Sequence, residues 1–222
     1  MSNGIKHGSG AYSIRYDLDE KTAEIDFSGI VPFFSGDTAC YRNDSTVFLF
    51  VANSYKQAYL CIKESLDHSF ESKNGKKVEH LILPYFFTFR HYLELVLKSF
   101  YMAITDSRMT KSHIIKDLFD IVLQESKKVD DRRYNYKDNF ENWKKDLLRH
   151  LCELKELLNE FYLLEPRIDY FRYLYDSKVN LERPIVTLDY KNNCELFDSI
   201  INKISIIEQD YSYLIGYNYL LG

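Results

Sequence analysis

The sequence predicts an all-α fold, a bundle of about five helices preceded by a small β-hairpin. Long segments carry apolar residues at spacings of three and four, which is the period of a helix with one buried face. Glycine (8) and proline (4) are scarce among the 222 residues, whereas tyrosine (19) and phenylalanine (15) are abundant. So few turn-forming residues argue against a many-stranded sandwich or barrel and against a disordered chain. We expect a leader and hairpin over residues 1–44 and a helical domain over residues 45–222.

The first elements follow from a change of period along the chain. Residues 1–10 are expected to form a loose leader. Ser13–Leu18 and Ala23–Phe27 alternate polar and apolar residues around a short polar turn, which predicts the hairpin. Helical periodicity then begins, with Ser45 as the N-cap of a first helix that ends near Leu66.

The middle of the chain is predicted to hold two helices. The polar run over 71–77 is expected to be a loop, followed by a helix over His80–Thr105 with Pro84 in its first turns or bending it. A shorter helix is expected over Ser112–Lys127. The charge-rich segment 127–138 should be a solvated connection.

The last third of the chain is predicted to hold two more helices. A fourth helix covers Asn139–Leu164 and is expected to end at Glu165-Pro166. Arg167–Tyr190 mixes aromatic, charged and β-branched residues and is expected to be a long irregular loop. A final helix over Asn192–Tyr219 carries a coiled-coil-like apolar seam, which suits a bundle or a dimer interface.

Charge and targeting signals exclude several classes of protein. With 29 basic and 33 acidic residues the net charge is −4, too mild for a nucleic-acid-coating protein or an acidic tail. No apolar run approaches the 18 or so residues of a membrane span, and the N-terminus has no apolar stretch of a signal peptide. We therefore expect a cytoplasmic protein without membrane contact.

Cysteine and histidine spacings carry no metal signature. The four cysteines (Cys40, Cys61, Cys152 and Cys194) include no C-x-x-C pair, and we expect them to be reduced and mostly buried. The six histidines include no H-x-x-x-H or H-E-x-x-H pair. We expect neither a metal nor a cofactor.

Charged residues interrupt the second predicted helix, which is otherwise apolar nearly all round. These residues are Arg90, His91, Glu94 and Lys98. Arg90, Glu94 and Lys98 follow one another at single-turn spacing and form a charged stripe. Because buried charges are costly unless they are paired or used, two interpretations stay open. The stripe is an internal salt-bridge ladder, or it faces a pocket where the arginine binds an anion and the glutamate orients a neighbour.

Two further clusters invite a functional interpretation. His113, at the start of the third predicted helix, could act as an acid or base near neutral pH, or could cap the helix or bond a carboxylate of the second helix. The segment Arg167–Asp176 holds four aromatic residues and two arginines. It could pack across the bundle, bringing Arg172 towards the stripe, or its aromatics could stack on bases while its arginines hold phosphates.

The three clusters, in this order, resemble a group of bacterial HEPN-like all-α proteins. The resemblance lies in Arg90-His-Tyr-Leu-Glu-Leu-Val-Leu-Lys98, in His113 followed by Leu118, and in Phe171-Arg-Tyr-Leu-Tyr-Asp176. It covers about residues 80–215 and implies a bundle of four or five helices, often dimeric. Many proteins of this superfamily are metal-independent RNases of toxin–antitoxin or antiphage systems.

The usual HEPN site is an R-x(4–6)-H motif near the last helix, in which the arginine stabilises the phosphate and the histidine assists attack by the 2′-hydroxyl. Here no arginine follows Arg183 and no histidine follows His150, so the final helix cannot carry this motif. Arg108 and His113 have the spacing but lie between the second and third helices. The loop also has Leu174 where proline is common.

The resemblance implies RNA binding or metal-independent RNA cleavage in antiphage defence or a toxin–antitoxin setting. Expected partners are RNA, a second copy of the chain, and an antitoxin or other defence-system protein. The expected catalytic residues are Arg90, His91, Glu94 and His113, and the expected phosphate- or RNA-binding residues are Lys98, Arg108, Arg172 and Tyr173. The alternative is a non-catalytic interaction module, or a sensor of a small anion or nucleotide held against Arg90 and Lys98.

Overall fold

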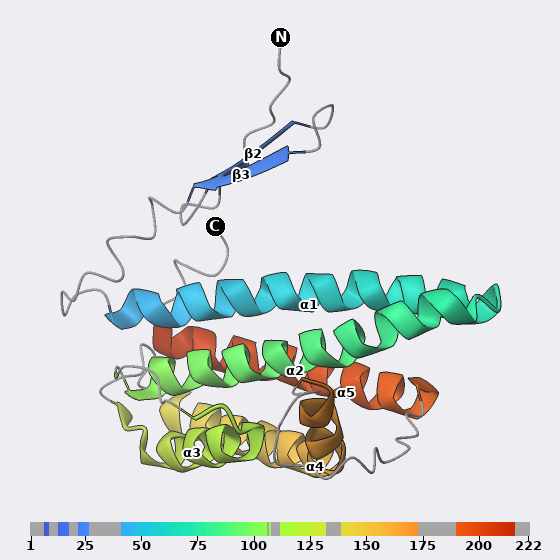
Figure 1. Cartoon of the computed structure of the whole chain (residues 1–222). Helices are drawn as coiled ribbons and strands as arrows, with labels where there is room; N and C mark the ends of the chain where they lie inside the picture. The colour runs from blue at the N-terminus through green and yellow to red at the C-terminus, as the bar shows by residue number, and fades with distance from the viewer. Residues whose placement is uncertain are drawn as a thin grey trace.

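A computed structural model of the chain (Figure 1) describes residues 7–8, 13–17, 22–26, 41–105, 107, 112–131, 139–172 and 190–215. Five α-helices lie in these ranges: α1 (Tyr41–Glu71), α2 (Gly75–Thr105), α3 (Ile115–Lys128), α4 (Phe140–Arg172) and α5 (Tyr190–Ile215). The predicted all-α bundle is confirmed. None of these helices is long and apolar enough to cross a bilayer.

Three short strands are described near the N-terminus: β1 (His7–Gly8), β2 (Ser13–Asp17) and β3 (Thr22–Asp26). They pair antiparallel in the order β1-β2-β3, with Ile14 opposite Ile25 and Tyr16 opposite Ala23. The residues between them lie outside the described part of the chain, as does the leader up to residue 6. The hairpin as an appendage to the bundle therefore stays a prediction.

Helix α2 is the centre of the bundle. Figure 1 shows α1 on one side of α2, and α3 and α4 on the other. Every residue from Tyr92 to Phe100 is buried, and α2 contacts each of the other four helices. A helix that is apolar nearly all round is expected in such a place. The apolar pattern of the second predicted helix therefore fits its central place in the bundle.

Aromatic rings fill the core where α1, α2, α4 and α5 meet. The rings of Phe89 and Phe197 stack with their centroids 3.8 Å apart and an angle of 5° between their planes. Tyr59, Tyr85 and Phe161 lie around this pair, each with a ring centroid within 6.3 Å of that of Phe197. Part of the tyrosine and phenylalanine content of the chain therefore forms this core.

The predicted apolar faces of α4 and α5 are confirmed. The buried residues at the expected positions are Trp143, Leu147, Leu151, Leu154, Leu158, Phe161, Phe197, Ile200, Ile204, Ile207 and Tyr211. Because the α5 residues are buried within a single chain, the seam of α5 serves the bundle.

The turn between α1 and α2 is shorter than the expected loop over 71–77. Lys73 has a positive φ of 55°, the Asn74 N–H donates to the Ser69 carbonyl at 2.8 Å, and the Lys73 N–H donates to the Phe70 carbonyl at 3.1 Å. This is a Schellman motif, which ends α1. The Asn74 side chain then accepts from the Lys77 N–H at 3.2 Å, so Asn74 caps the start of α2.

Several expected helix ends are wrong. The first helix continues past Leu66 to Glu71, and the second begins at Gly75 and not at His80. Ser45 does not cap α1, because the helix begins at Tyr41 and Ser45 is buried within it, where its carbonyl accepts from the Ser99 hydroxyl at 2.7 Å. The third helix begins at Ile115 and not at Ser112. The fourth helix continues through Pro166 to Arg172. A proline removes one backbone hydrogen bond of a helix, and α2 accommodates the same loss at Pro84.

Candidate functional site

The charged stripe of α2 is buried at the place where the chain passes from α2 to α3. Arg90, Glu94 and Lys98 are 3%, 4% and 2% exposed. The single-turn spacing places all three on one face of α2, as predicted. That face meets residues 112–114, which precede α3.

The stripe and His113 form one hydrogen-bonded cluster. Glu94 Oε2 accepts from Arg90 Nη1 at 3.3 Å, and Glu94 Oε1 accepts from Lys98 Nζ at 2.6 Å. His113 Nδ1 lies 2.7 Å from the same Oε1 atom. Arg90 Nη2 donates to the backbone carbonyl of His113 at 2.7 Å. A bond from His113 to a carboxylate of the second helix, one of the alternatives expected from the sequence, is therefore present.

Glu94 is ionised in this cluster, and its charge fixes the proton on His113. Burial raises the pKa of Glu94, but hydrogen bonds from Lys98 and His113 outweigh burial and lower the pKa below its usual value. An ionised carboxylate only accepts, so Nδ1 of His113 carries a hydrogen and donates it. Lys98 Nζ also lies 3.5 Å from Nδ1. Because both atoms are then hydrogen-bond donors, they do not bond to each other, and the Lys98 ammonium donates to Glu94 instead.

The opposite side of the His113 ring faces solvent. The side chain is 68% exposed although its Nδ1 contacts a buried carboxylate. In the neutral ring with a hydrogen on Nδ1, the Nε2 atom holds the lone pair. A carboxylate therefore holds one ring nitrogen, Nδ1, while the other, Nε2, is on the solvent side. This is the arrangement of a general base whose tautomer and orientation are fixed.

Of the other four expected site residues, His91 is the one whose side chain the structure describes. His91 lies against Tyr55 of α1, with ring centroids 4.4 Å apart, and stacks on Phe87. Arg108 and Tyr173 lie outside the described residues. Arg172 is the last residue of α4, and its side chain lies outside the described part of the chain. The expectation that residues 167–172 belong to an irregular loop is wrong, because they are helical.

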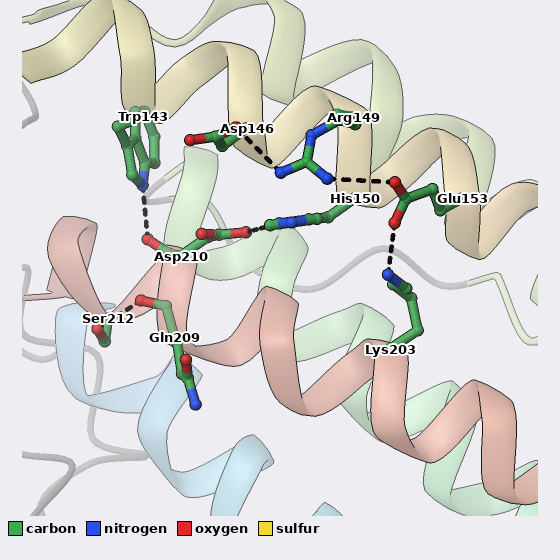
Figure 2. Close-up of polar contacts among 9 residues, drawn as sticks. All are labelled: Trp143, Asp146, Arg149, His150, Glu153, Lys203, Gln209, Asp210 and Ser212. Carbon is green, nitrogen blue, oxygen red and sulfur yellow. Dashed lines mark hydrogen bonds and ion pairs between the residues drawn. The ribbon is translucent and has the colours of Figure 1, made fainter.

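A second polar cluster, between α4 and α5, was not predicted (Figure 2). His150 Nδ1 lies 2.7 Å from Asp210 Oδ2, and both side chains are largely buried. The backbone carbonyl of Asp210 accepts from Trp143 Nε1 at 2.8 Å. Arg149 bridges Asp146 and Glu153 on the exposed side of α4. No spacing rule pairs residues 60 positions apart, so the sequence gives no signal for the contact between His150 and Asp210.

Within the described helices, two buried side-chain atoms of α2 and α5 have no hydrogen-bond partner among the contacts seen. These are the Tyr92 hydroxyl in α2 and the Glu208 Oε1 atom in α5. Burial raises the pKa of Glu208, and the Lys56 ammonium offsets this only in part. Burial also raises the pKa of Tyr92 well above its usual range.

We expect Glu208→Gln to stabilise the protein at neutral pH by about 1 kcal/mol, because an ionised carboxyl is no longer buried without a partner. A raised folded-state pKa gives stability that is present at acid pH and lost as the pH rises through that pKa. The gain over wild type, measured by urea unfolding, should therefore shrink on acidification. Tyr92→Phe is the companion variant, since its effect should not vary with pH between acid and neutral. A gain for Glu208→Gln that is equal at both pH values would contradict the prediction.

The expected burial of the cysteines is wrong for two of them. Cys61 and Cys152 are exposed on α1 and α4, Cys194 is half-buried, and Cys40 lies outside the described residues. In the described part of the chain, no group of three or more His, Cys, Asp or Glu side chains could hold a metal ion.

No protein-family model, curated protein or solved structure matches this chain.

Proposed function

We propose that this chain is a HEPN-like RNA-binding protein with metal-independent endoribonuclease activity, acting in antiphage defence or as part of a toxin–antitoxin pair. The observation that carries the proposal is the pair formed by His113 and Glu94, in which a buried carboxylate orients a solvent-exposed imidazole. The resemblance of the motifs around these two residues to HEPN-like proteins supports the same reaction.

In this reaction His113 is the general base. Nε2 takes the proton of a ribose 2′-hydroxyl, and the 2′-oxygen attacks the adjacent phosphorus. The bond from phosphorus to the 5′-oxygen breaks, and that oxygen takes a proton from water, while the imidazolium returns its proton to the hydroxide that remains. The products are a 2′,3′-cyclic phosphate and a 5′-hydroxyl. Glu94 stabilises the imidazolium that forms, because it already accepts the Nδ1 hydrogen at 2.7 Å.

Lys116 is the candidate phosphate contact among the described residues near His113. It is exposed in the first turn of α3, three residues after His113. Lys98 is less suited to this role, because its ammonium is buried and donates to Glu94. We therefore assign the expected phosphate contact of Lys98 to Lys116 in this proposal.

The test is an RNA-cleavage assay with His113→Ala and a matched control, His68→Ala, which removes an exposed histidine of α1. We expect the first variant to lose activity by a factor of about 10²–10⁴, the usual contribution of a general base, and the second to retain it. A substrate with a single 2′-deoxyribose at the cleaved position should not be cut there. Cleavage that is equal in wild type and His113→Ala, or absent in both, would sink the enzyme proposal.

The alternative proposal is a non-catalytic HEPN-like interaction module. It is favoured by one observation: Arg90, Glu94 and Lys98 bond to one another inside the protein, as a structural ladder would. In that case His113→Ala would change neither cleavage nor RNA binding. Substitutions of Arg90, Glu94 or Lys98 would then alter only the free energy of unfolding.

A further inference from the structure

His113 is held by α2 at two points, one on its ring and one on its backbone. Glu94 bonds the ring at Nδ1, and Arg90 Nη2 donates to the His113 carbonyl oxygen at 2.7 Å. Arg90 Nη1 also donates to Glu94 Oε2 at 3.3 Å. A single guanidinium thus joins the carboxylate that orients the ring to the peptide that carries the ring.

Local structure alone fixes His113 weakly. The residue lies outside the helices, two positions before α3 begins. Ile114 occupies the N-cap position with an extended backbone and no side-chain cap hydrogen bond, and isoleucine is a poor N-cap. Next to His113, the Ile114 N–H donates a hydrogen bond to the Ser112 hydroxyl at 3.3 Å. Because the imidazole is mostly exposed, packing against other side chains does little to fix its orientation.

We infer that Arg90 is a positioning residue, which holds His113 against Glu94 through the His113 carbonyl oxygen. This inference rests on the proposed function, because the position of His113 matters for cleavage only if His113 is the base. The planar fork of arginine suits the role, since two parallel N–H groups can reach two acceptors in fixed directions. Arg90 is buried, so the role replaces the direct phosphate contact expected from the sequence.

Substitution of Arg90 can leave a folded protein. Lys98 Nζ lies 2.6 Å from Glu94 Oε1, closer than the 3.3 Å between Arg90 Nη1 and Glu94 Oε2. Arg90→Met therefore leaves Glu94 paired with Lys98. Methionine also fills much of the volume of the arginine stem. Arg90→Lys keeps the charge but offers one ammonium, which cannot reproduce the fork.

The experiment compares Arg90→Met and Arg90→Lys with Arg149→Met, a matched control that removes an exposed arginine bridging two carboxylates of α4 (Figure 2). The first readout is the tautomer of His113, from the ¹⁵N chemical shifts of its ring nitrogens at mildly alkaline pH. We expect a hydrogen on Nδ1 in wild type and Arg149→Met, and a mixture of both tautomers in both Arg90 variants. The second readout is kcat and KM for RNA cleavage.

We expect kcat to fall at least about tenfold in both Arg90 variants with KM nearly unchanged, because a misplaced base slows the chemical step. A raised KM with unchanged kcat would show that Arg90 binds the substrate phosphate, and an unchanged tautomer would show that Arg90 does not position the ring. Recovery of both readouts in Arg90→Lys would assign the effect to charge. Each of these three results overturns the inference. If wild type does not cleave RNA, the proposed function fails, but the tautomer still decides whether Arg90 positions His113.

Discussion

Replacing Glu94 with alanine is expected to destabilise the folded protein by about 3–5 kcal/mol, the usual cost of removing one partner from a buried ion pair. Among the described residues, Glu94 is the carboxylate that accepts a hydrogen bond from Lys98 Nζ, and it also accepts one from Arg90. Without it, two buried cations on neighbouring turns of α2 lose the carboxylate that both of them contact. Urea unfolding at neutral pH measures the loss.

The pH dependence of this loss has a definite sign. Because the folded-state pKa of Glu94 is lowered, its stabilising contribution is present above the pKa of the unfolded chain and is lost as the pH falls through the folded-state pKa. The difference between wild type and Glu94→Ala should therefore shrink in acid. Glu153→Ala is the matched control, since this exposed carboxylate pairs with Arg149 and Lys203 at the surface and should matter much less. Equal losses for the two variants would show that the ladder does not support the fold.

Replacing Phe197 with alanine is expected to cost about 3–5 kcal/mol as well, for a different reason. The ring is fully buried and stacks on Phe89 of α2 at 3.8 Å, while Phe161 of α4 and Tyr59 of α1 lie against its other sides. Removing the ring leaves a cavity at the junction of four helices, and each helix would have to move inward to fill it. Thermal or urea unfolding of the variant measures the cost.

Phe70→Ala is the control for this prediction. Phe70 is partly exposed on α1 and stacks on a single ring, that of Tyr190. Its loss should cost about 1 kcal/mol or less, as at most surface positions. If the two phenylalanine variants were equally stable, the aromatic junction would not be the part of the core that holds the helices together.

The buried faces of the helices could be predicted from the sequence because they depend on period alone. Trp143 and Leu147 of α4 are buried where the spacing of three and four places them. The ends of the helices could not be predicted in the same way. Ser45 has the side chain of an N-cap but lies inside α1, and the residue that caps α2 is Asn74, in a run that looks like a plain polar loop. Whether a capping residue is used depends on its backbone conformation, which composition does not show.

Contacts of the candidate site within one helix could be predicted from the sequence. Contacts between α2 and the segment before α3 could not. The spacing of Arg90, Glu94 and Lys98 places them on one face of α2 without any knowledge of the fold. The bond from Glu94 to His113 was one of several alternatives from the sequence, because it requires the path of the chain after α2. The bond from Arg90 to the His113 carbonyl could not be anticipated, since a backbone acceptor leaves no mark in the sequence.

The charged stripe, from Arg90 to Lys98, overlaps the continuously buried stretch of α2, from Tyr92 to Phe100. Natural selection for the proposed site and for a folded core would therefore act here on one short segment. A substitution in this segment that improves the site can destabilise the core, and the reverse also holds. Fewer sequences are therefore compatible with both requirements. The segment should consequently drift more slowly during evolution than the exposed surface of α4, where charge partners can be exchanged without touching the core.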